Sequence, residues 1–279
     1  MTYINDILHE RLADFYSKSR KLTVLTGAGL SADSGIPTFR DKDGFWSVGS
    51  VNYMPEEMGT YKMYLDKPLE VWKWFLYRHT ICSKALPNIG HFAVKELEDI
   101  FADRFKLITQ NVDGLHFKAG TSREKTYLIH GTLEKARCGK ECSNELYSYP
   151  EIFLDKGQEL TKDQIEILKC KKCGHFLRPH VLWFDENYNE KYFKLDSSMR
   201  TAKETGLLLI VGTSGATNLP QRIVESVLSR QGMIIDINLK ENYFSEVADK
   251  KKNGYTLTGK SSDILPEFVE LFKKLDTAK

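Results

Sequence analysis

Two pairs of cysteines are the residues whose types and spacing most directly specify a chemistry. Cys138 and Cys142 stand in ARCGKECS, and Cys170 and Cys173 stand in KCKKCGH. Two close pairs separated by a longer stretch are typical of a four-cysteine zinc ribbon, because each pair supplies two thiolates to one tetrahedral ion. Four thiolates close the coordination shell, so we expect one zinc ion with a structural role. The alternative is a set of unrelated reduced thiols.

A glycine turn follows the first apolar run of the chain. Residues 22–26 form a short β-branched run that stops at Gly27-Ala28-Gly29. Glycine lets the chain bend tightly and lets backbone N–H groups approach a ligand, which at a strand-to-helix turn is usually a phosphate. The common dinucleotide fingerprint has a third glycine that opens a helix. Here Gly35 lies in a second turn instead, so the segment predicts a nucleotide site of a less common kind.

Polar residues stand at the ends of further strand-like runs. They are Gln110, Asn111 and Asp113 after one run, Gly212, Thr213 and Ser214 after another, and Asn238 after a third. Side-chain amides and carboxylates can hold ribose hydroxyls or a carboxamide, and glycine N–H groups and hydroxyls can hold phosphate. Asp236 is open between a direct role and that of a hydrogen-bonded strand-end carboxylate.

His130 also follows a strand-like run, directly before Gly131. A histidine that faces a crevice is suited to general base catalysis, because its pKa lies near neutrality. Taken alone, the residue type and position of His130 favour a structural role over a catalytic one.

The elements that must position these residues are short strands alternating with helical patterns. This alternation predicts an α/β fold with a parallel sheet covered by helices on both faces, and a ligand crevice at the carboxyl ends of the strands. The predicted strands are residues 22–26, 105–109, 127–129, 181–184, 207–211 and 233–237. Residues 41–100, which are aromatic and helical in pattern, and residues 136–177, which carry the cysteine pairs, break the alternation and predict a smaller second lobe.

Composition narrows the class of protein. The chain has 279 residues and a net charge of +2, which gives no reason to expect nucleic acid as a partner. The lysines at 250–252 are expected to form a solvated loop. The sequence has no apolar stretch of the roughly 20 residues needed to span a bilayer, and its first residues have no apolar signal core. Five cysteines then point to metal or chemistry in a cytoplasmic protein rather than to disulfides.

In this order the motifs resemble the sirtuin family of NAD-dependent protein deacylases, over almost the whole chain. Besides the paired cysteines, the matching segments are GAGLSADSGIPTFR (27–40), TQNVDGLH (109–116), IHG (129–131), RPHVLWFDE (178–186), GTSG (212–215) and IDINL (235–239). The resemblance implies a Rossmann-like NAD-binding domain from residues 1–40, 101–135 and 178–279. It implies a smaller lobe made of a helical module with a cofactor loop, residues 41–100, and a zinc-ribbon module, residues 136–177.

The resemblance also implies roles for individual residues. The pyrophosphate and nearby groups of NAD would be held by Gly27, Ala28, Gly29, Ser31, Gly212, Thr213 and Ser214. Phe39 and Arg40 would lie on a mobile loop over the nicotinamide ribose. Gln110, Asn111 and Asp113 would line the nicotinamide pocket, and Asn238 and Ser261 would face the adenosine end. His130 would be the catalytic base, with Asn111 as its catalytic partner.

The chemistry implied is the transfer of an acyl group from a protein lysine to ADP-ribose. The acyl oxygen attacks the ribose carbon that nicotinamide leaves, and His130 then deprotonates a ribose hydroxyl that attacks the imidate carbon. Acetyl is the expected acyl group, with other acyl groups open. The expected partners are acylated lysines of proteins, with no nucleic acid and no membrane, and the oligomeric state is open.

The sequence departs from the family pattern around the substrate. Phe75 and Arg78 occupy the positions of the Tyr-x-x-Arg pair with which one subclass binds acidic acyl groups. Arg78 could clamp a carboxylate or be a solvated or structurally paired arginine. Phe184-Asp185-Glu186 replaces an FGE triplet, and the loop after GTSG is one residue longer than common. Val181 and Phe184 are substrate-contact candidates, and whether the FDE triplet and the 215–220 loop bind a peptide as an added strand is open.

Two other functions compete with deacylation. An ADP-ribosyltransferase or NAD glycohydrolase on the same scaffold would account for the altered peptide loops, but it would not need His130 in the same way. A non-catalytic NAD sensor or zinc-dependent binding module would not require Asn111, Asp113 and His130 together.

Overall fold

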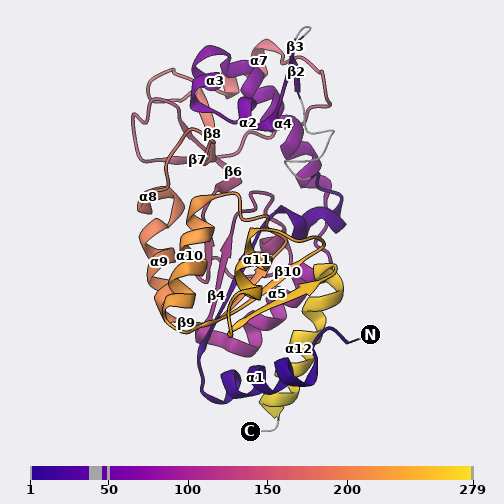
Figure 1. Ribbon diagram of the computed structural model, residues 1–279. Coiled ribbons are helices and arrows are strands. Elements are labelled where there is room, and N and C mark those ends of the chain that lie inside the picture. Colours follow the sequence, from indigo (N-terminus) through magenta and orange to yellow (C-terminus); the bar gives the residue numbers. More distant parts are fainter. Residues whose placement is uncertain (1, 38–45, 49–50, 278–279) are drawn as a thin grey trace.

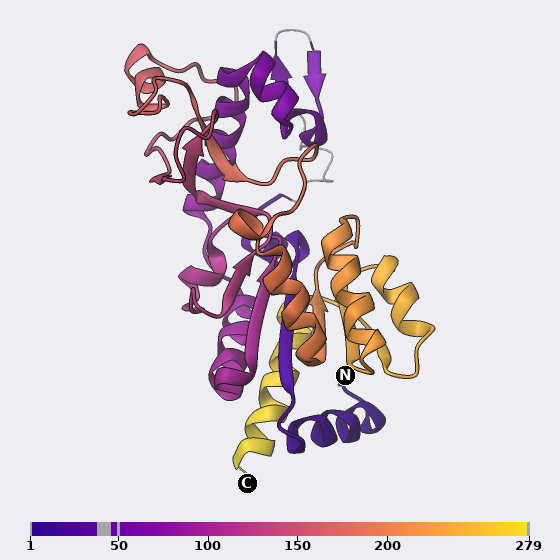
Figure 2. The same ribbon diagram turned by 90° about the vertical axis from the view of Figure 1, so that its left-hand side faces the viewer.

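The computed structural model describes residues 2–37, 46–48 and 51–277, which form two lobes (Figure 1). Figure 2 shows the same two lobes from the side, with both ends of the described chain on the larger lobe and the C-terminal end at its foot. Phe39 and Arg40 lie outside the described residues.

The larger lobe is built on a parallel sheet of six strands in the order β11-β10-β9-β1-β4-β5. The strands are β1 (Lys21–Thr26), β4 (Phe105–Thr109), β5 (Thr126–Leu128), β9 (Thr205–Val211), β10 (Met233–Asn238) and β11 (Gly254–Thr258). Both faces of such a sheet are covered, so its strands can be apolar throughout. β9 is buried at every residue, which is why its sequence reads as one continuous apolar run.

Helices cover both faces of this sheet, as the sequence predicts. Alternate residues of β9 point to opposite faces, so that Leu207 and Leu209 join one apolar core and Leu208 and Ile210 join the other. The first core is closed by α1 (Asp6–Ser17), α5 (Ile89–Phe101) and α12 (Ser261–Thr277). The second is closed by α9 (Leu195–Glu204), α10 (Asn218–Ser229) and α11 (Tyr243–Asp249).

The smaller lobe combines a helical part and an antiparallel sheet around a third apolar core. Its helices are α2 (Pro55–Met58), α3 (Tyr61–Asp66), α4 (Pro68–Lys84) and α7 (Lys162–Ile167). Its strands are the hairpin β2 (Trp46–Val48) and β3 (Val51–Tyr53), and the sheet of β6 (Gly131–Cys138), β7 (Leu146–Ser148) and β8 (Leu177–Val181). The 3-10 helices η1 (Ala28–Ser34) and η2 (Ala102–Arg104) and the short helices α6 (Leu115–Lys118) and α8 (Glu190–Phe193) connect the elements.

The prediction of a parallel strand at 181–184 is wrong. The strand is β8, which ends at Val181 and pairs antiparallel with β6 in the smaller lobe. Residues 182–184 form a loop, in which the Phe184 N–H donates to the Gly59 carbonyl after α2. An apolar run of four residues carries no periodicity that separates these cases.

Most of helix α5 lies within residues 41–100, which the resemblance assigns to the helical module of the smaller lobe, but the helix packs in the larger lobe. Val94, Leu97 and Phe101 pack into the core of the large sheet, because the apolar face of this helix meets α12 and β4. In the part of the chain that the structure describes, no helix is long and apolar enough to cross a membrane.

Candidate functional site

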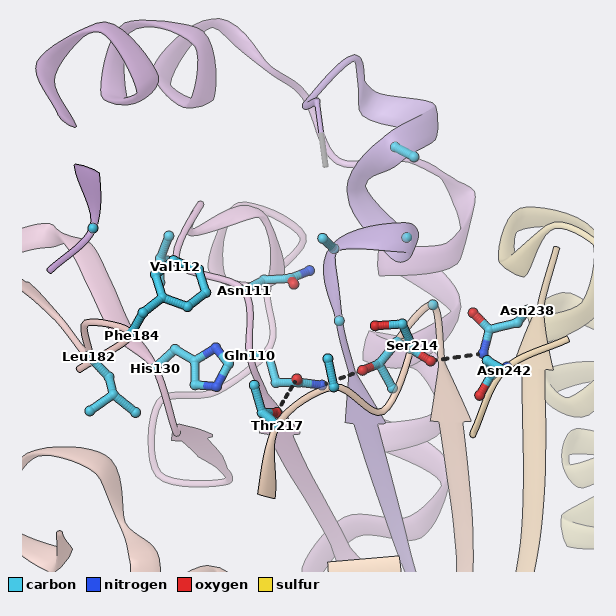
Figure 3. A pocket seen from close by; sticks show the side chains of 18 of the residues that line it. Gln110, Asn111, Val112, His130, Leu182, Phe184, Ser214, Thr217, Asn238 and Asn242 are labelled. Atoms are coloured by element: carbon cyan, nitrogen blue, oxygen red, sulfur yellow. Dashed lines mark hydrogen bonds between the residues drawn. The ribbon is translucent and has the colours of Figure 1, made fainter. Parts of the chain in front are cut away.

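A cavity of about 800 Å³ lies at the carboxyl ends of β1, β4, β9 and β10, and loops of the smaller lobe form its other wall (Figure 3). It brings together most residues that the sequence singles out. Of the predicted cofactor and catalytic residues, those that line it are Gly27, Ala28, Gly29, Gln110, Asn111, His130, Gly212, Thr213, Ser214, Asn238 and Ser261.

The glycines of the two strand-end turns pack backbone against backbone. A Cβ atom on Gly29 would lie 2.8 Å from the Gly212 Cα atom, and one on Gly212 would lie 2.4 Å from the Leu30 nitrogen. The N–H groups of Gly27 and Gly29 donate to the carbonyls of Val211 and Gly212, at 2.9 and 2.8 Å. These two glycines therefore join the turns to each other, and their N–H groups are engaged within the protein.

His130 is held at the centre of the cavity wall. Burial lowers its pKa to about 4, and a hydrogen bond with the Gln110 backbone opposes this shift. Its Nε2 atom lies 2.7 Å from the Tyr188 hydroxyl. The imidazole is therefore neutral near pH 7 and fixed in orientation, as a general base requires.

Asn111, Ser31 and Asp113 form a buried hydrogen-bonded cluster behind the cavity. Asn111 Nδ2 donates to Ser31 Oγ at 3.1 Å, and Ser31 Oγ donates to Asp113 Oδ2 at 2.7 Å. Burial raises the pKa of Asp113, which also accepts from the Leu115 N–H. Ser31 and Asp113 do not line the large cavity, although Asp113 lines a smaller one of about 180 Å³. They are placed to orient Asn111.

His91 joins this cluster, although no motif in the sequence points to it. Its Nε2 atom lies 3.3 Å from Ser31 Oγ, and its side chain is fully buried. The preceding Asn88 caps α5 and donates to the Leu30 carbonyl, which ties the start of this helix to η1. The only signal in the sequence is an asparagine at a helix start, which says nothing about where that helix docks.

Asp236 fixes the side chains at the far end of the cavity. It accepts hydrogen bonds from Asn238 Nδ2 at 2.8 Å and from Asn242 Nδ2 at 2.7 Å. Burial raises its pKa to about 6, and the two amides oppose that shift. Asn238 also lies at the cavity with Ser261, which begins α12 and so brings a helix N-terminus to this end.

The predicted substrate residues are only partly brought together. Phe75, Val181 and Phe184 line the cavity, whereas Arg78 does not and lies with its guanidinium 5.6 Å from the Trp74 ring centroid. Asp185 accepts from the N–H groups of Tyr61 and Lys62, at 2.7 and 3.1 Å. This carboxylate therefore caps α3.

The four predicted zinc ligands lie together in the smaller lobe. The Sγ atoms of Cys138, Cys142, Cys170 and Cys173 all lie within 4.8 Å of one another. Cys138 and Cys173 are 3.5 Å apart, and Cys142 and Cys170 are 3.6 Å apart. Zn–S bonds of ~2.3 Å in a tetrahedron separate the sulfur atoms by about 3.8 Å. The four cysteines are thus placed to hold one zinc ion in a closed shell.

The chain is similar to known proteins over most of its length. The Sir2 family matches residues 27–218. An "NAD-dependent protein deacylase" of Leptospira interrogans (serogroup Icterohaemorrhagiae serovar Lai, strain 56601) is 37% identical over 262 residues, covering 94% of this chain and 97% of that protein.

Two solved structures are also similar. A Sir2 homologue in complex with NAD has a TM-score of 0.79 and 35% identity, covering 96% of this chain and 94% of that one. A mutant Sir2 homologue in complex with 2'-O-acetyl ADP-ribose has a TM-score of 0.78 and 35% identity, covering 95% of this chain and 96% of that one.

Proposed function

The chain belongs to the Sir2 family, and from this membership we propose that it removes acyl groups from protein lysine side chains in an NAD-dependent reaction. The acyl group would pass to ADP-ribose, giving free lysine, nicotinamide and O-acyl-ADP-ribose. The observation that carries the proposal is that His130 and the strand-end turns of β1 and β9 line one cavity. A nucleotide bound in this cavity would therefore contact both the strand-end turns and the base.

NAD would supply the ribose that accepts the acyl group. We assign its pyrophosphate to Ala28, Thr213 and Ser214, beside the turns that Gly27, Gly29 and Gly212 allow. The adenosine end is assigned to Asn238 and Ser261. The nicotinamide end is assigned to Gln110 and Asn111, with Ser31 and Asp113 orienting Asn111. Phe39 and Arg40 stay a prediction from the resemblance, as the covering loop.

His130 is proposed as the base for the ribose hydroxyl. Because burial lowers the pKa of its imidazole to about 4, the lone pair is available throughout the neutral range. The hydrogen bond to the Gln110 backbone fixes the ring, and Asn111 would hold the ribose and nicotinamide in one orientation. Orientation and exclusion of water matter most for a step in which a glycosidic bond breaks.

The acyl-lysine is assigned to the other wall of the cavity, at Phe75, Val181 and Phe184. The long apolar side of this wall suits the acyl chain and the lysine methylenes. Arg78 is not part of the cavity lining, so we assign it a structural role within α4, where its guanidinium lies against the Trp74 ring. Acetyl is the simplest substrate group for such a wall. Zinc would have a structural role only, and a cytoplasmic location stays a prediction from the reduced thiols.

The experiment is incubation with NAD and a panel of acetyl-, succinyl-, lipoyl- and long-chain acyl-lysine peptides. We expect O-acyl-ADP-ribose, whereas free ADP-ribose or labelled protein would indicate a glycohydrolase or an ADP-ribosyltransferase, and absence of NAD turnover a binding module. The names of the relatives favour deacylation over these alternatives.

His130→Ala and Asn111→Ala are expected to abolish deacylation. Far-UV circular dichroism and zinc content should match those of the wild-type chain, because neither residue contacts the cysteine cluster. Full activity of His130→Ala would contradict the proposed mechanism.

A further inference from the structure

The two segments that depart from the family pattern meet at the proposed base. Tyr188 follows the Phe184-Asp185-Glu186 triplet by two residues, and Thr217 lies in the longer loop after Gly215. The Tyr188 hydroxyl lies 2.7 Å from His130 Nε2, and the Thr217 side chain hydrogen-bonds that hydroxyl. All three residues line the cavity.

These contacts form a polar ring around the base. The Thr217 hydroxyl has a single proton, which it donates to Gln110 Oε1 at 3.2 Å when it does not donate to Tyr188; Figure 3 draws the contact with Gln110 as a dashed line. The Gln110 backbone in turn hydrogen-bonds His130. The backbone contact occupies one ring nitrogen, so the phenol stands at the nitrogen whose lone pair would accept a proton.

From this geometry we propose that Tyr188 relays the proton from the ribose hydroxyl to His130. This inference rests on the proposed function. In the relay the ribose O–H bond breaks as the Tyr188 oxygen gains that proton, and the phenol O–H bond breaks as Nε2 gains the other. One proton moves from ribose to imidazole, and Tyr188 ends in the state in which it began.

The surroundings of Tyr188 suit this role. Burial raises the pKa of its hydroxyl to about 12, so the phenol is neutral and able to donate at any pH at which the chain works. Its ring packs against the second core of the large lobe, with Met199 and Leu195 in the same cluster. Tyr188→Phe therefore removes the hydroxyl and keeps the packing.

The test separates the two halves of the reaction. Loss of nicotinamide precedes the proton transfer, so exchange of labelled nicotinamide into NAD should persist in Tyr188→Phe. Formation of O-acyl-ADP-ribose in a single turnover should fall by about 100-fold or more, as for loss of a proton-transfer group, with KM for NAD within about twofold of wild type. Combining Tyr188→Phe with His130→Ala should add little to the loss from His130→Ala alone.

Tyr192→Phe is the matched control, because Tyr192 packs on Arg137 outside the cavity lining. This substitution should change neither nicotinamide exchange nor product formation.

Two further readouts do not depend on the turnover of a variant. In the chain without NAD, the nitrogen NMR signal of His130 Nε2 should shift when Tyr188→Phe removes its hydrogen-bond donor. In mixtures of light and heavy water, single turnovers of the wild-type chain should show two protons in motion.

Three results would overturn the relay. One is Tyr188→Phe forming product at the wild-type rate or faster, which would make Tyr188 inert or a blocking group. Another is loss of nicotinamide exchange together with product formation, which would mean that Tyr188 acts on NAD binding. The third is a single proton in motion in the wild-type chain. A wild-type chain that forms no O-acyl-ADP-ribose would overturn the proposed function itself.

Discussion

Burial around His130 decides which form of its imidazole is present. A solvated histidine is half protonated near pH 6.5, whereas the His130 imidazole has a pKa of about 4. The shift lowers the stability of the fold only below about pH 6.5, and it gives the base a free lone pair through the whole neutral range.

A pH profile tests this state of the base. Because the pKa of His130 is lowered, its neutral form is retained as the pH falls from about 8 to about 5, and kcat/KM for NAD should show no loss with a midpoint near 6.5. The profile of kcat/KM reports groups of the free enzyme. A midpoint near 6.5 that follows the titration of His130, measured by NMR, would contradict the burial of this side chain.

Residues of the site differ in how well the sequence predicts them. Gln110 follows β4, His130 lies two residues after β5, and Asn238 is the last residue of β10. The ends of parallel strands meet at one edge, so the meeting of these residues could be predicted. Tyr188 and His91 reach the site from a loop and a helix. Their positions depend on how those segments dock, which no local pattern encodes.

The facing turns after β1 and β9 depend on glycine for their close approach. Gly212 has a φ of 61° and leaves no room for a Cβ beside the Leu30 nitrogen. Gly157 has a φ of 84°, but a Cβ atom there would meet nothing within 4 Å. Substitution of Gly212 would therefore combine backbone strain with a steric clash, whereas substitution of Gly157 would cause backbone strain alone.

Gly212→Ala is expected to destabilise the chain by about 2–4 kcal/mol and to weaken NAD binding, because strain and displacement of the turn add. Gly157→Ala carries only the backbone strain, and we expect a loss of about 1 kcal/mol with NAD binding unchanged. Chemical denaturation and NAD titration measure both effects. Equal losses of stability in the two variants would exclude the close turn contact as a cause.

The zinc ribbon is expected to depend on its ion. Cys173→Ser removes one ligand, so zinc should be lost during chelator treatment that leaves the wild-type site filled. The sheet of the larger lobe shares no apolar core with the ribbon, and its far-UV signal should persist. Zinc content and proteolysis within residues 136–177 provide the measurement, and retention of zinc by Cys173→Ser would contradict the four-thiolate shell.

The strands of the large sheet show which sequence patterns are sufficient to predict a strand. β1, β4, β9 and β10 are largely apolar runs ended by glycine or polar residues, and their bounds lie close to the predicted ones. β11, Gly254–Thr258, escapes prediction because this edge strand is only partly buried and its sequence carries no apolar run. The loop after Val181 is the opposite case, because its apolar sequence predicts a strand where the structure has none.

The folded molecule as a whole holds several imidazoles in their neutral form. Burial lowers the pKa of His91 and of His130 to about 4, and that of His116 well below its usual range. The unfolded chain takes up protons at these groups below about pH 6.5. Between about pH 6.5 and pH 4 the unfolded state therefore binds more protons, and stability falls as the pH falls.

Acid denaturation should show this linkage. Each of the three imidazoles adds up to ~1.4 kcal/mol per pH unit to the loss of stability in this window. His116→Gln should flatten the dependence of the unfolding free energy on pH between about 6.5 and 4, measured with urea. An equal slope in His116→Gln and wild type would contradict the assignment.

The order of strands across the large sheet has a consequence for synthesis on the ribosome. β1 is central, and its neighbours β4 and β9 begin at Phe105 and Thr205. At about 5–20 residues per second, the edge of β1 that β9 will cover waits roughly ten to forty seconds for its partner to be made. During that interval the nascent chain exposes an apolar strand with an open hydrogen-bonding edge, the kind of segment that chaperones bind and that aggregates when it is left uncovered.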